Sequence, residues 1–405
     1  MGVSACTSED NFIAIVGGRD VSEEKQGAPP IKLSSPDVGA EEIEAVLDVF
    51  RGGRIALGPK LVDFERAVAE YTGCAHGVAV NSGTSALHII VRSLGIGDGD
   101  EVITTPFGFI ASANCILFER GIPRFVDIDP DTLNIDCALI EAAITPRTKA
   151  ILAVDLFGCP ADWSRLRELA RTHNLALIED SCEALGARYR LSDGTWARAG
   201  SLADVGTFAF YPNKQITTGE GGVVVTDRDD IAALCRSLRN QGRDDGTDWM
   251  QPTRLGYSYR IAELNCALGL AQMQRIDEIL AARRRVASWY GELLAEVPGV
   301  RAPYEPEGTE TSWFVYVVRL TESPSREYAH AVRDKLRGEG IACANYFYPI
   351  HLLPHYREQF GFKEGDFPIT ERVASQTLAL PFYNQLRRDE VERVVTSLQR
   401  AVASM

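Results

Sequence analysis

Residues 149–180 read KAILAVDLFGCPADWSRLRELARTHNLALIED and carry the pattern of a strand, a helix and a second strand. The apolar runs 149–157 and 175–180 flank residues 162–173, whose apolar positions recur with helical spacing. Short apolar runs joined by ten or more residues of helical periodicity are typical of βαβ units, in which the two strands are parallel. This stretch therefore predicts an α/β fold.

The alternation continues on both sides of this unit. Runs such as HGVAV at 76–80 precede helical patterns, and VGTFAF and GGVVVTD follow the unit, separated by a loop rich in Gly and Thr. Near Asn265 the pattern changes to a long, nearly uninterrupted helical stretch, followed by SWFVYVVRL, which alternates like a half-buried strand. We predict an N-terminal extension (1–30), a large domain with a mostly parallel sheet flanked by helices (31–264), and a smaller α+β domain (265–405).

The composition is that of a globular protein with a sizeable core. The 405 residues are 45% hydrophobic and 24% charged. The net charge of −14 disfavours non-specific binding to nucleic acid and to anionic membranes, so we expect neither as a partner. No apolar run approaches the ~18 residues that indicate a transmembrane helix, and the first residues lack the pattern of a signal peptide.

Nine cysteines are scattered along the chain, with no C-x-x-C pair and no paired histidine spacing. An odd number of scattered cysteines indicates reduced thiols rather than a disulfide framework. We therefore expect a cytoplasmic protein, and we expect no metal site.

The first motif is NSGTSALH, residues 81–88, which follows a strand and opens a helix. The main-chain N–H groups and hydroxyls of Thr84 and Ser85, together with the helix dipole, can bind an anion such as phosphate. Taken alone, the segment favours the simpler interpretation of a capped helix start, with Gly83 allowing the turn.

The second motif is LALIEDSCEALGA, in which a strand delivers Glu179 and Asp180 at its carboxyl end. Ligands of open α/β sheets bind at that end, so one of these acids can hold a protonated ring nitrogen. An isolated Asp180 that merely caps the next turn is an equally good interpretation.

The third motif, GTFAFYPNKQITTGEGG, is the most specific. An apolar strand leads into Lys214, and a Gly-rich turn follows. A loop lysine is usually a solvated charge, but one withdrawn from water has a lowered pKa and attacks carbonyls, which favours Schiff-base chemistry. The lysine precedes the glycines, contrary to the order in a P-loop, so nucleoside triphosphate hydrolysis is disfavoured.

Taken together, these segments resemble the DegT-type (StrS-type) sugar-nucleotide aminotransferases, pyridoxal-phosphate enzymes of fold type I. The resemblance covers nearly everything from about Ile31 to the C-terminus. It rests on ordered matches in LGPKLVDFE, NSGTSALH, FGFIASAN, FVDIDPDTLNID, IEDSCEALGA, FYPNKQITTGEGG, SLRNQGR, LGYSYRIAELNCALGLAQ, YPIHLLP and LALPFY.

The resemblance implies a cofactor, pyridoxal 5′-phosphate (PLP), which alternates with its amino form (PMP). It implies a Schiff base at Lys214, pairing of the pyridinium nitrogen with Asp180, and a ring hydroxyl beside Glu183. The ring would stack on Phe109, for which core packing is the alternative interpretation. The phosphate would be bound by Thr84 and Ser85 and by Ser258 of a partner subunit.

The resemblance also implies a homodimer, in which the loop LGYSYR completes the partner's site. Tyr257, Ser258 and Arg260 are candidates to cross the interface, and the alternative for Arg260 is a pair with a surface acid. His351 matches a loop that the family brings toward the sugar, although a lone histidine is more often structural. Charge alone suggests that Arg260, Arg243 and Lys60 contact a diphosphate.

Three positions depart from the family pattern. Ala209 replaces a serine that bonds the phosphate, and Thr207 or a partner group is a possible substitute. Ser258 replaces the usual asparagine of the partner loop, and Asp155 replaces a common histidine. These departures concern individual contacts rather than the cofactor.

The implied reaction transfers an amino group from an amino acid, glutamate by family likeness, to a nucleotide-linked keto-deoxysugar. This gives an amino sugar for polysaccharide, glycan or antibiotic biosynthesis. Related dehydratases use free PMP and carry histidine at the position of Lys214, so the lysine disfavours that alternative. A regulatory PLP-binding protein without turnover and an enzyme acting on amino acids alone also remain alternatives.

Overall fold

The computed structural model describes residues 29–244, 246, 248, 250–323 and 325–405. The predicted extension 1–30 therefore lies outside the described residues, apart from its last two. Within the described chain, no helix is long and apolar enough to cross a membrane.

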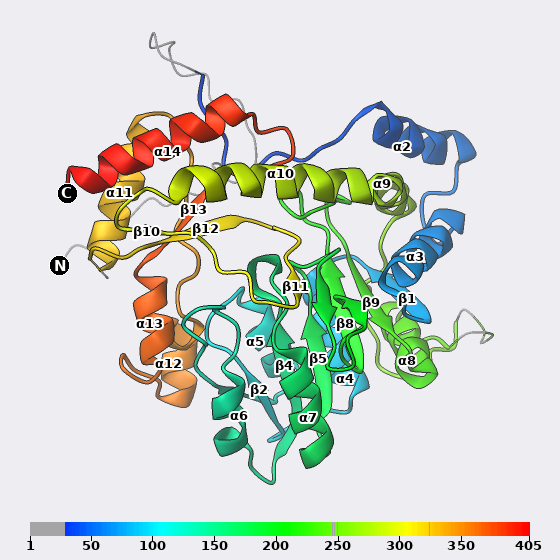
Figure 1. The fold of residues 1–405 in the computed structure, drawn as a ribbon. Coiled ribbons are helices and arrows are strands. Elements are labelled where there is room, and N and C mark those ends of the chain that lie inside the picture. The colour runs from blue at the N-terminus through cyan, green and yellow to red at the C-terminus, as the bar shows by residue number, and fades with distance from the viewer. Residues whose placement is uncertain (1–28, 245, 247, 249, 324) are drawn as a thin grey trace, which may run out of the picture.

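Seven strands form the central sheet, in the order β1-β9-β8-β5-β4-β2-β3 (Figure 1). The five strands from β8 to β3 are parallel, whereas β9 is antiparallel to both of its neighbours. The prediction of a mostly parallel sheet is confirmed. The strands are β1 His76–Val80, β2 Glu101–Thr104, β3 Ile122–Phe125, β4 Thr148–Val154, β5 Ala176–Asp180, β8 Val205–Ala209 and β9 Gly222–Thr226.

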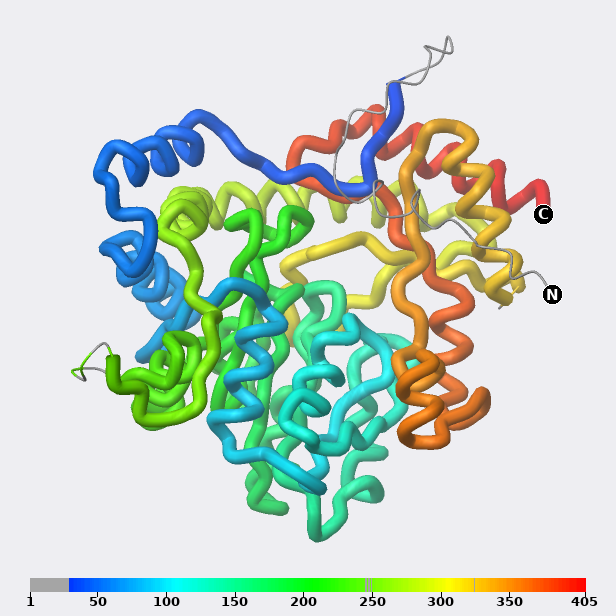
Figure 2. Tube along the Cα trace, turned by 180° about the vertical axis from the view of Figure 1, so that it is seen from behind, coloured from blue at the N-terminus to red at the C-terminus, as the bar shows by residue number. Residues whose placement is uncertain are grey.

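Helices cover both faces of this sheet. On the face turned toward the viewer in Figure 2, α4, α5 and α8 bury one large apolar cluster against the strands. On the opposite face, α6 and α7 cover the middle strands, and α3, α9 and α10 cover β1, β8 and β9, while α2 packs on α9. These helices are α2 Ala40–Gly52, α3 Pro59–Thr72, α4 Gly83–Ser93, α5 Ala111–Phe118, α6 Cys137–Ala143, α7 Trp163–His173, α8 Asp229–Arg239, α9 Glu263–Gln274 and α10 Ile276–Leu294.

A second apolar core lies between the C-terminal helices and a three-stranded sheet, β10-β12-β13. All five residues of β12 are buried, so the prediction of a half-buried strand is wrong here. Tyr316, Val318 and Leu320 pack into the second core, and Arg319 on the other face donates to the carbonyl of Pro130. A third sheet, β11-β6-β7, is short. These elements are β6 Arg188–Arg190, β7 Trp196–Arg198, β10 Val300–Arg301, β11 Thr309–Glu310, β12 Tyr316–Leu320, β13 Thr377–Leu380, α11 Arg326–Gly338, α12 Pro354–Phe360, α13 Pro368–Ala374, α14 Arg388–Ala403 and the 3₁₀ turns η1 Leu156–Gly158 and η2 Ile350–Leu352.

The stretch predicted as one long helix is two helices, α9 and α10, which meet at Arg275. There the guanidinium of Arg275 donates to Glu42 of α2 over 2.8 Å. Residues up to Leu280 pack with the large sheet, and those from Val286 onward pack with the second core, which also takes in Ile31. Helix α10 thus links the two cores, and the division at residue 264 stays a prediction.

Helix α3 has an unusual cap. The carboxylate of Glu263, at the start of α9, accepts the main-chain N–H groups of Lys60 and Leu61, each over 2.9 Å. Only 1% of Glu263 is exposed. This side chain therefore joins two helices that are 200 residues apart in the chain.

We expect Glu263→Gln to lower the free energy of unfolding by about 1–3 kcal/mol, because an amide has only one acceptor oxygen and leaves one buried N–H without a partner. Chemical denaturation measures this. Glu296→Gln, at an exposed position, is the matched control and should change stability by less than about 0.5 kcal/mol. Equal stability of the two variants would contradict the assigned cap.

Candidate active site

Lys214 lies in the loop between β8 and β9, with its side chain turned away from water. Only 13% of the side chain is exposed, and Nζ lies 3.6 Å from Oε1 of Glu183. The amine also lies 3.9 Å from the ring centroid of Phe314. A lysine withdrawn from water beside one acid and one ring is placed to act on a bound molecule rather than to solubilise the surface.

Asp180 ends β5 and is nearly buried. Its Oδ2 accepts the hydroxyl of Ser112 over 2.6 Å, and its Oδ1 accepts the N–H of Cys182 over 3.2 Å. Because parallel strands point their carboxyl ends to one edge of the sheet, Asp180 lies where open α/β folds bind ligands. The hydroxyl of Ser112 fixes the direction of this carboxylate.

Glu183 follows one turn later and is also buried. Its Oε2 accepts the N–H of Phe157 over 2.9 Å. Burial raises the pKa of Glu183, while the neighbouring Lys214 ammonium acts in the opposite direction. Burial also raises the pKa of the Cys182 thiol, and the charges of Asp180, Lys214 and Glu183 all act on this pKa. These three predicted side chains therefore lie in the neighbourhood of Cys182.

The loop before α4 approaches the sheet closely. Ser82 caps the helix by accepting the N–H of Ser85 over 3.0 Å, and the hydroxyl of Ser85 donates to Asn81 over 2.7 Å. The N–H of Ser85 is therefore used by the cap, and the single hydrogen of its hydroxyl is donated to Asn81, so a phosphate would have to replace Asn81 as the acceptor. Thr84 is half-buried in the same first turn. The capped helix start is confirmed, and the anion site stays a prediction.

Gly83 is required by this close approach. A Cβ there would lie 2.6 Å from Cβ of Ala209 and 3.1 Å from Sγ of Cys182. Ala209 is the position at which the family pattern has a serine. Thr207, two residues earlier on β8, has a buried hydroxyl without a hydrogen-bond partner among the described residues.

Phe109 precedes α5, and 57% of it is exposed. Its carbonyl accepts the N–H of Ser112 over 3.3 Å, so the residue that orients Asp180 lies in the same turn as Phe109. An aromatic side chain this exposed does not pack in the core, which was the alternative interpretation.

Tyr257 is engaged within its own chain. Its hydroxyl donates to Glu119 over 3.0 Å, and its ring stacks on that of Tyr259. Glu119 is also 2.8 Å from Nε2 of His88, and it accepts from Arg92 over 2.6 Å. These contacts hold the segment before Ser258 against α4 and α5.

Ser258 and Arg260 lie next to this anchored segment. The guanidinium of Arg260 donates to the hydroxyl of Ser258 over 2.9 Å and to the amide oxygen of Asn240 over 3.3 Å. Arg243 donates to that same oxygen over 3.3 Å, so two of the predicted diphosphate ligands lie together. Arg260 forms no pair with an acid in the described part of the chain, contrary to the alternative interpretation.

Lys60 and His351 are placed differently. Lys60 lies in the first turn of α3, whose N–H groups are capped by Glu263. His351 is fully buried, with Nε2 3.0 Å from Glu371 and its ring against Phe367. Burial lowers the pKa of His351 and outweighs the opposite effect of Glu371. This environment favours the structural interpretation of the histidine.

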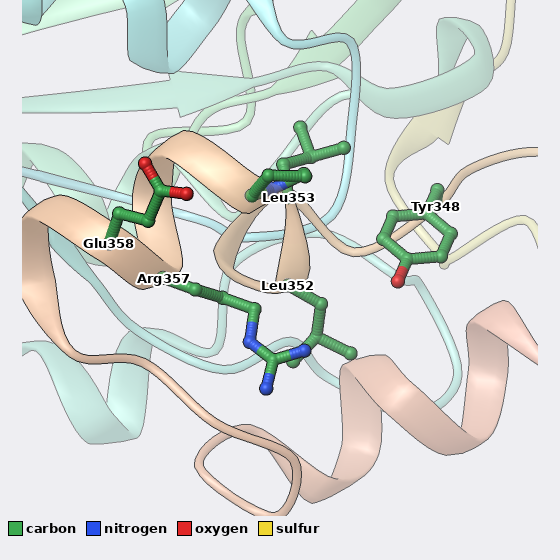
Figure 3. A pocket seen from close by; sticks show the side chains of 6 residues that line it. Tyr348, Leu352, Leu353, Arg357 and Glu358 are labelled. Atoms are coloured by element: carbon green, nitrogen blue, oxygen red, sulfur yellow. The ribbon is translucent and has the colours of Figure 1, made fainter. Parts of the chain in front are cut away.

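A surface hollow of about 490 Å³ lies at η2 and the start of α12 (Figure 3). Its side chains come from the loop before η2, from η2 and from α12, and none of them is a predicted site residue. The hollow is lined by Tyr348, Leu352, Leu353, Pro354, Arg357 and Glu358.

Among the described residues, no group of three or more His, Cys, Asp and Glu side chains could hold a metal ion.

Three residues that contact the predicted site were not singled out from the sequence. Ser112 falls three residues after Phe109 in a helical pattern, a spacing that could have identified it. Phe314 and Arg283 belong to the C-terminal half, and nothing in their local sequence indicates that they reach Lys214. Fully buried Arg283 donates to the carbonyls of Lys214, Trp313 and Phe314, and burial lowers its pKa to about 10.

Comparison with known proteins identifies the family of the chain. The model of the DegT/DnrJ/EryC1/StrS aminotransferase family matches residues 36–399. The chain belongs to this family. It is 40% identical over 376 residues to the GDP-perosamine synthase of Caulobacter vibrioides, covering 92% of this chain and 99% of that protein. It is 35% identical to the spore coat polysaccharide biosynthesis protein SpsC of Bacillus subtilis, covering 92% and 97%.

Solved structures extend the likeness to the fold. DesV of S. venezuelae, solved with a ketimine intermediate, has a TM-score of 0.85 and 34% identity over 93% of this chain and 99% of its own. PseC of Helicobacter pylori has a TM-score of 0.87 and 27% identity over 93% and 100%. A sugar aminotransferase of Streptococcus pneumoniae is known in PLP and PMP forms. The family member described here is a PLP-dependent aminotransferase of fold type I.

We expect Gly83→Ala to destabilise the protein by about 1–3 kcal/mol, because its Cβ would overpack the contact with Ala209. Gly97→Ala is the control, since no atom lies within 4 Å of the Cβ that it adds. Denaturant unfolding of both variants measures the difference. A Gly83→Ala protein as stable as the control would show that α4 does not approach β8 this closely.

Proposed function

We propose that this enzyme transfers the amino group of glutamate to the keto carbon of a nucleotide-linked keto-deoxysugar, giving an amino sugar. The observation that carries the proposal is the meeting of Lys214, Asp180 and Glu183 at the carboxyl edge of the sheet. The relatives named for amino-sugar synthesis, which match this chain over nearly their whole length, support the sugar as acceptor.

The residues at this edge fit a pyridoxal cofactor. When bound, PLP supplies an electron sink that accepts the amino group from one substrate and passes it to the next. Asp180 would hold the ring nitrogen in its protonated form, because its carboxylate is buried and already oriented by Ser112. Phe109 would cover the ring face, and Glu183 would bond the ring hydroxyl.

The phosphate would lie at the first turn of α4. Its ligands there would be Thr84 and the hydroxyl of Ser85, next to the positive end of the helix dipole. The close contact of Gly83 with Ala209 leaves no room for a larger side chain between the helix and β8.

Lys214 would act twice. It would bind the cofactor covalently, and after release by the amino donor its amine would remove the proton from the donor's α-carbon. Only 13% of its side chain is exposed, and Nζ lies over the ring of Phe314, which limits the access of water to this amine. The buried carboxyl of Glu183 is close enough to orient the amine between these two tasks.

We propose that two chains form a homodimer with shared active sites. The segment 257–260 is anchored at Tyr257 and presents Ser258 and Arg260 next to Arg243. The guanidinium of Arg260 pairs with no acid among the described residues, which suits the diphosphate of a nucleotide sugar in the partner's site, and Ser258 would complete the phosphate contacts. Lys60 stays a candidate for the same diphosphate on charge alone.

We also propose that the enzyme works in the cytoplasm. All eight cysteines of the described residues are free thiols, and most are buried. Free thiols suit a reducing compartment, and nucleotide sugars and glutamate would serve as its small-molecule substrates.

Lys214→Ala should reduce amino transfer by at least about a thousandfold, because the covalent anchor and the base are lost together. The assay converts the enzyme to its PMP form with glutamate, adds a panel of nucleotide keto-sugars, and follows 2-oxoglutarate and the recovery of the visible absorbance. Lys149→Ala, at an exposed position, is the control and should retain wild-type rates.

The outcomes of this assay separate the alternatives. Normal amination by Lys214→Ala would contradict the assignment of Lys214 as the covalent anchor and base. Cofactor binding without any response to glutamate would favour a regulatory protein, and a response to glutamate with no acceptance of any keto-sugar would favour an enzyme of amino acids alone. Loss of water from the sugar with free PMP would identify a dehydratase.

Mixing subunits tests the shared site. Lys214→Ala and Arg260→Ala chains are each expected to be inactive. After unfolding and refolding together, random dimers should regain about a quarter of the wild-type sites, because each mixed dimer contains one site without either defect. If Arg260 instead serves the site of its own chain, the mixture stays inactive.

A further inference from the structure

Two carboxyl groups outside the cofactor contacts are buried side by side. Asp155 follows β4, and Glu179 lies one residue before Asp180 on the neighbouring strand β5. Neither is exposed to any extent, and Ser181 between them is equally buried. No Lys, Arg or His side chain among the described residues forms an ion pair with either acid.

The hydrogen bonds of Ser181 limit the charge of this pair. Its Oγ lies 2.8 Å from Oδ2 of Asp155 and 2.9 Å from Oε1 of Glu179. A serine hydroxyl carries one hydrogen and can donate it to one of the two oxygens only. The second contact is a hydrogen bond only if a carboxyl group supplies the proton.

The remaining contacts decide where that proton lies. Oδ1 of Asp155 accepts the N–H of Ala161 and the indole N–H of Trp163, each over 2.9 Å. Main-chain N–H groups of Gly200 and Leu202 donate to Oε1 and Oε2 of Glu179, respectively. Burial raises the pKa of both acids. Each oxygen of Glu179 accepts an N–H, whereas Oδ2 of Asp155 accepts no N–H among the described residues, so Asp155 is the better site for the proton.

We infer that Asp155, Ser181 and Glu179 form a one-proton clamp that positions Asp180 for its contact with the cofactor. Asp155 Oδ2–H donates to Ser181 Oγ, and Ser181 Oγ–H donates to Glu179 Oε1. Glu179 and Ser181 flank Asp180 in the chain, and the N–H of Asp155 donates to the carbonyl of Asp180 over 3.0 Å. The clamp therefore fixes both neighbours and the main chain of Asp180, and its role rests on the function proposed above.

The other groups that face the clamp carry no charge at neutral pH. The thiol of Cys159 lies near Asp155 and that of Cys74 lies near Glu179. Burial raises the pKa of Cys159 to about 12 and that of Cys74 to about 11. Removing the clamp's proton would leave two buried carboxylates facing each other without a counter-charge.

Asp155→Asn tests the clamp without breaking its hydrogen bonds. The amide oxygen can still accept from Ala161 and Trp163, and the amide NH₂ can donate to Ser181. The hydroxyl of Ser181 still donates to Glu179, which is ionised. The variant keeps one negative charge and holds no proton.

The first measurement uses the protein without cofactor. Infrared spectra at neutral pH should show the C=O band of a buried carboxylic acid that Asp155→Asn lacks. The wild-type denaturation midpoint should fall between about pH 5 and pH 8 relative to that of the variant, because a folded-state pKa raised above the unfolded value gives stability that is lost as pH rises. An unchanged acid band in the variant would overturn the inference.

The second measurement tests the positioning role in the holoenzyme. Ser181→Ala should lower kcat about tenfold with little change in KM for the keto-sugar, because Asp180 is misplaced while the sugar site is intact. The wild-type kcat should also fall at high pH relative to that of Asp155→Asn, which has no proton to lose. Matching pH profiles would overturn the inference. If amination is absent altogether but the infrared result holds, the proposed function fails and the one-proton pair stands.

Discussion

The removal of ionisable side chains from water at one edge of the sheet is the constraint on which the site depends. Lys214, Asp180 and Glu183 are each largely buried. An uncompensated buried charge is costly, so each must be held by fixed partners. Ser112, the N–H of Phe157 and the ring of Phe314 supply these partners. Burial of these ionisable groups costs free energy of folding, and the same burial makes the groups reactive.

Arg283 shows how the two cores cooperate in this arrangement. It lies on the helix that links them, and its guanidinium reaches the carbonyl of Lys214 and that of Phe314. Carbonyl oxygens, and no acid within the described chain, accept from its two terminal nitrogens, while its Nε has no hydrogen-bond partner among the described residues. It therefore leaves the carboxylates of the site free to act on the cofactor. A rotation of one core against the other would move the amine of Lys214 relative to Phe314.

The sequence was sufficient to predict the α/β fold with a mostly parallel sheet, and it singled out Asp180 and Lys214 as site residues. Periodicity identified the parallel strands, and the end of each strand indicated Asp180 and the loop of Lys214, because chain order alone brings strand ends to one edge. Contacts made by distant segments were not predictable. Phe314 and Arg283 reach the site through the packing of the second core, and β12 is buried on both faces because the second core covers one face and the segment at Pro130 lies against the other.

The histidine and the tyrosine of the predicted site show a further limit. Motif likeness selected His351 and Tyr257, yet within this chain His351 pairs with Glu371 and Tyr257 with Glu119. Glu119 has no motif of its own, since it ends a helix whose pattern is otherwise apolar. A polar side chain in a loop can hold the loop in place rather than contact the substrate. Only the identity of its hydrogen-bond partner distinguishes these two roles. For Tyr257 that partner fixes the segment carrying Ser258 and Arg260, so its contribution to a neighbouring subunit's site would be indirect.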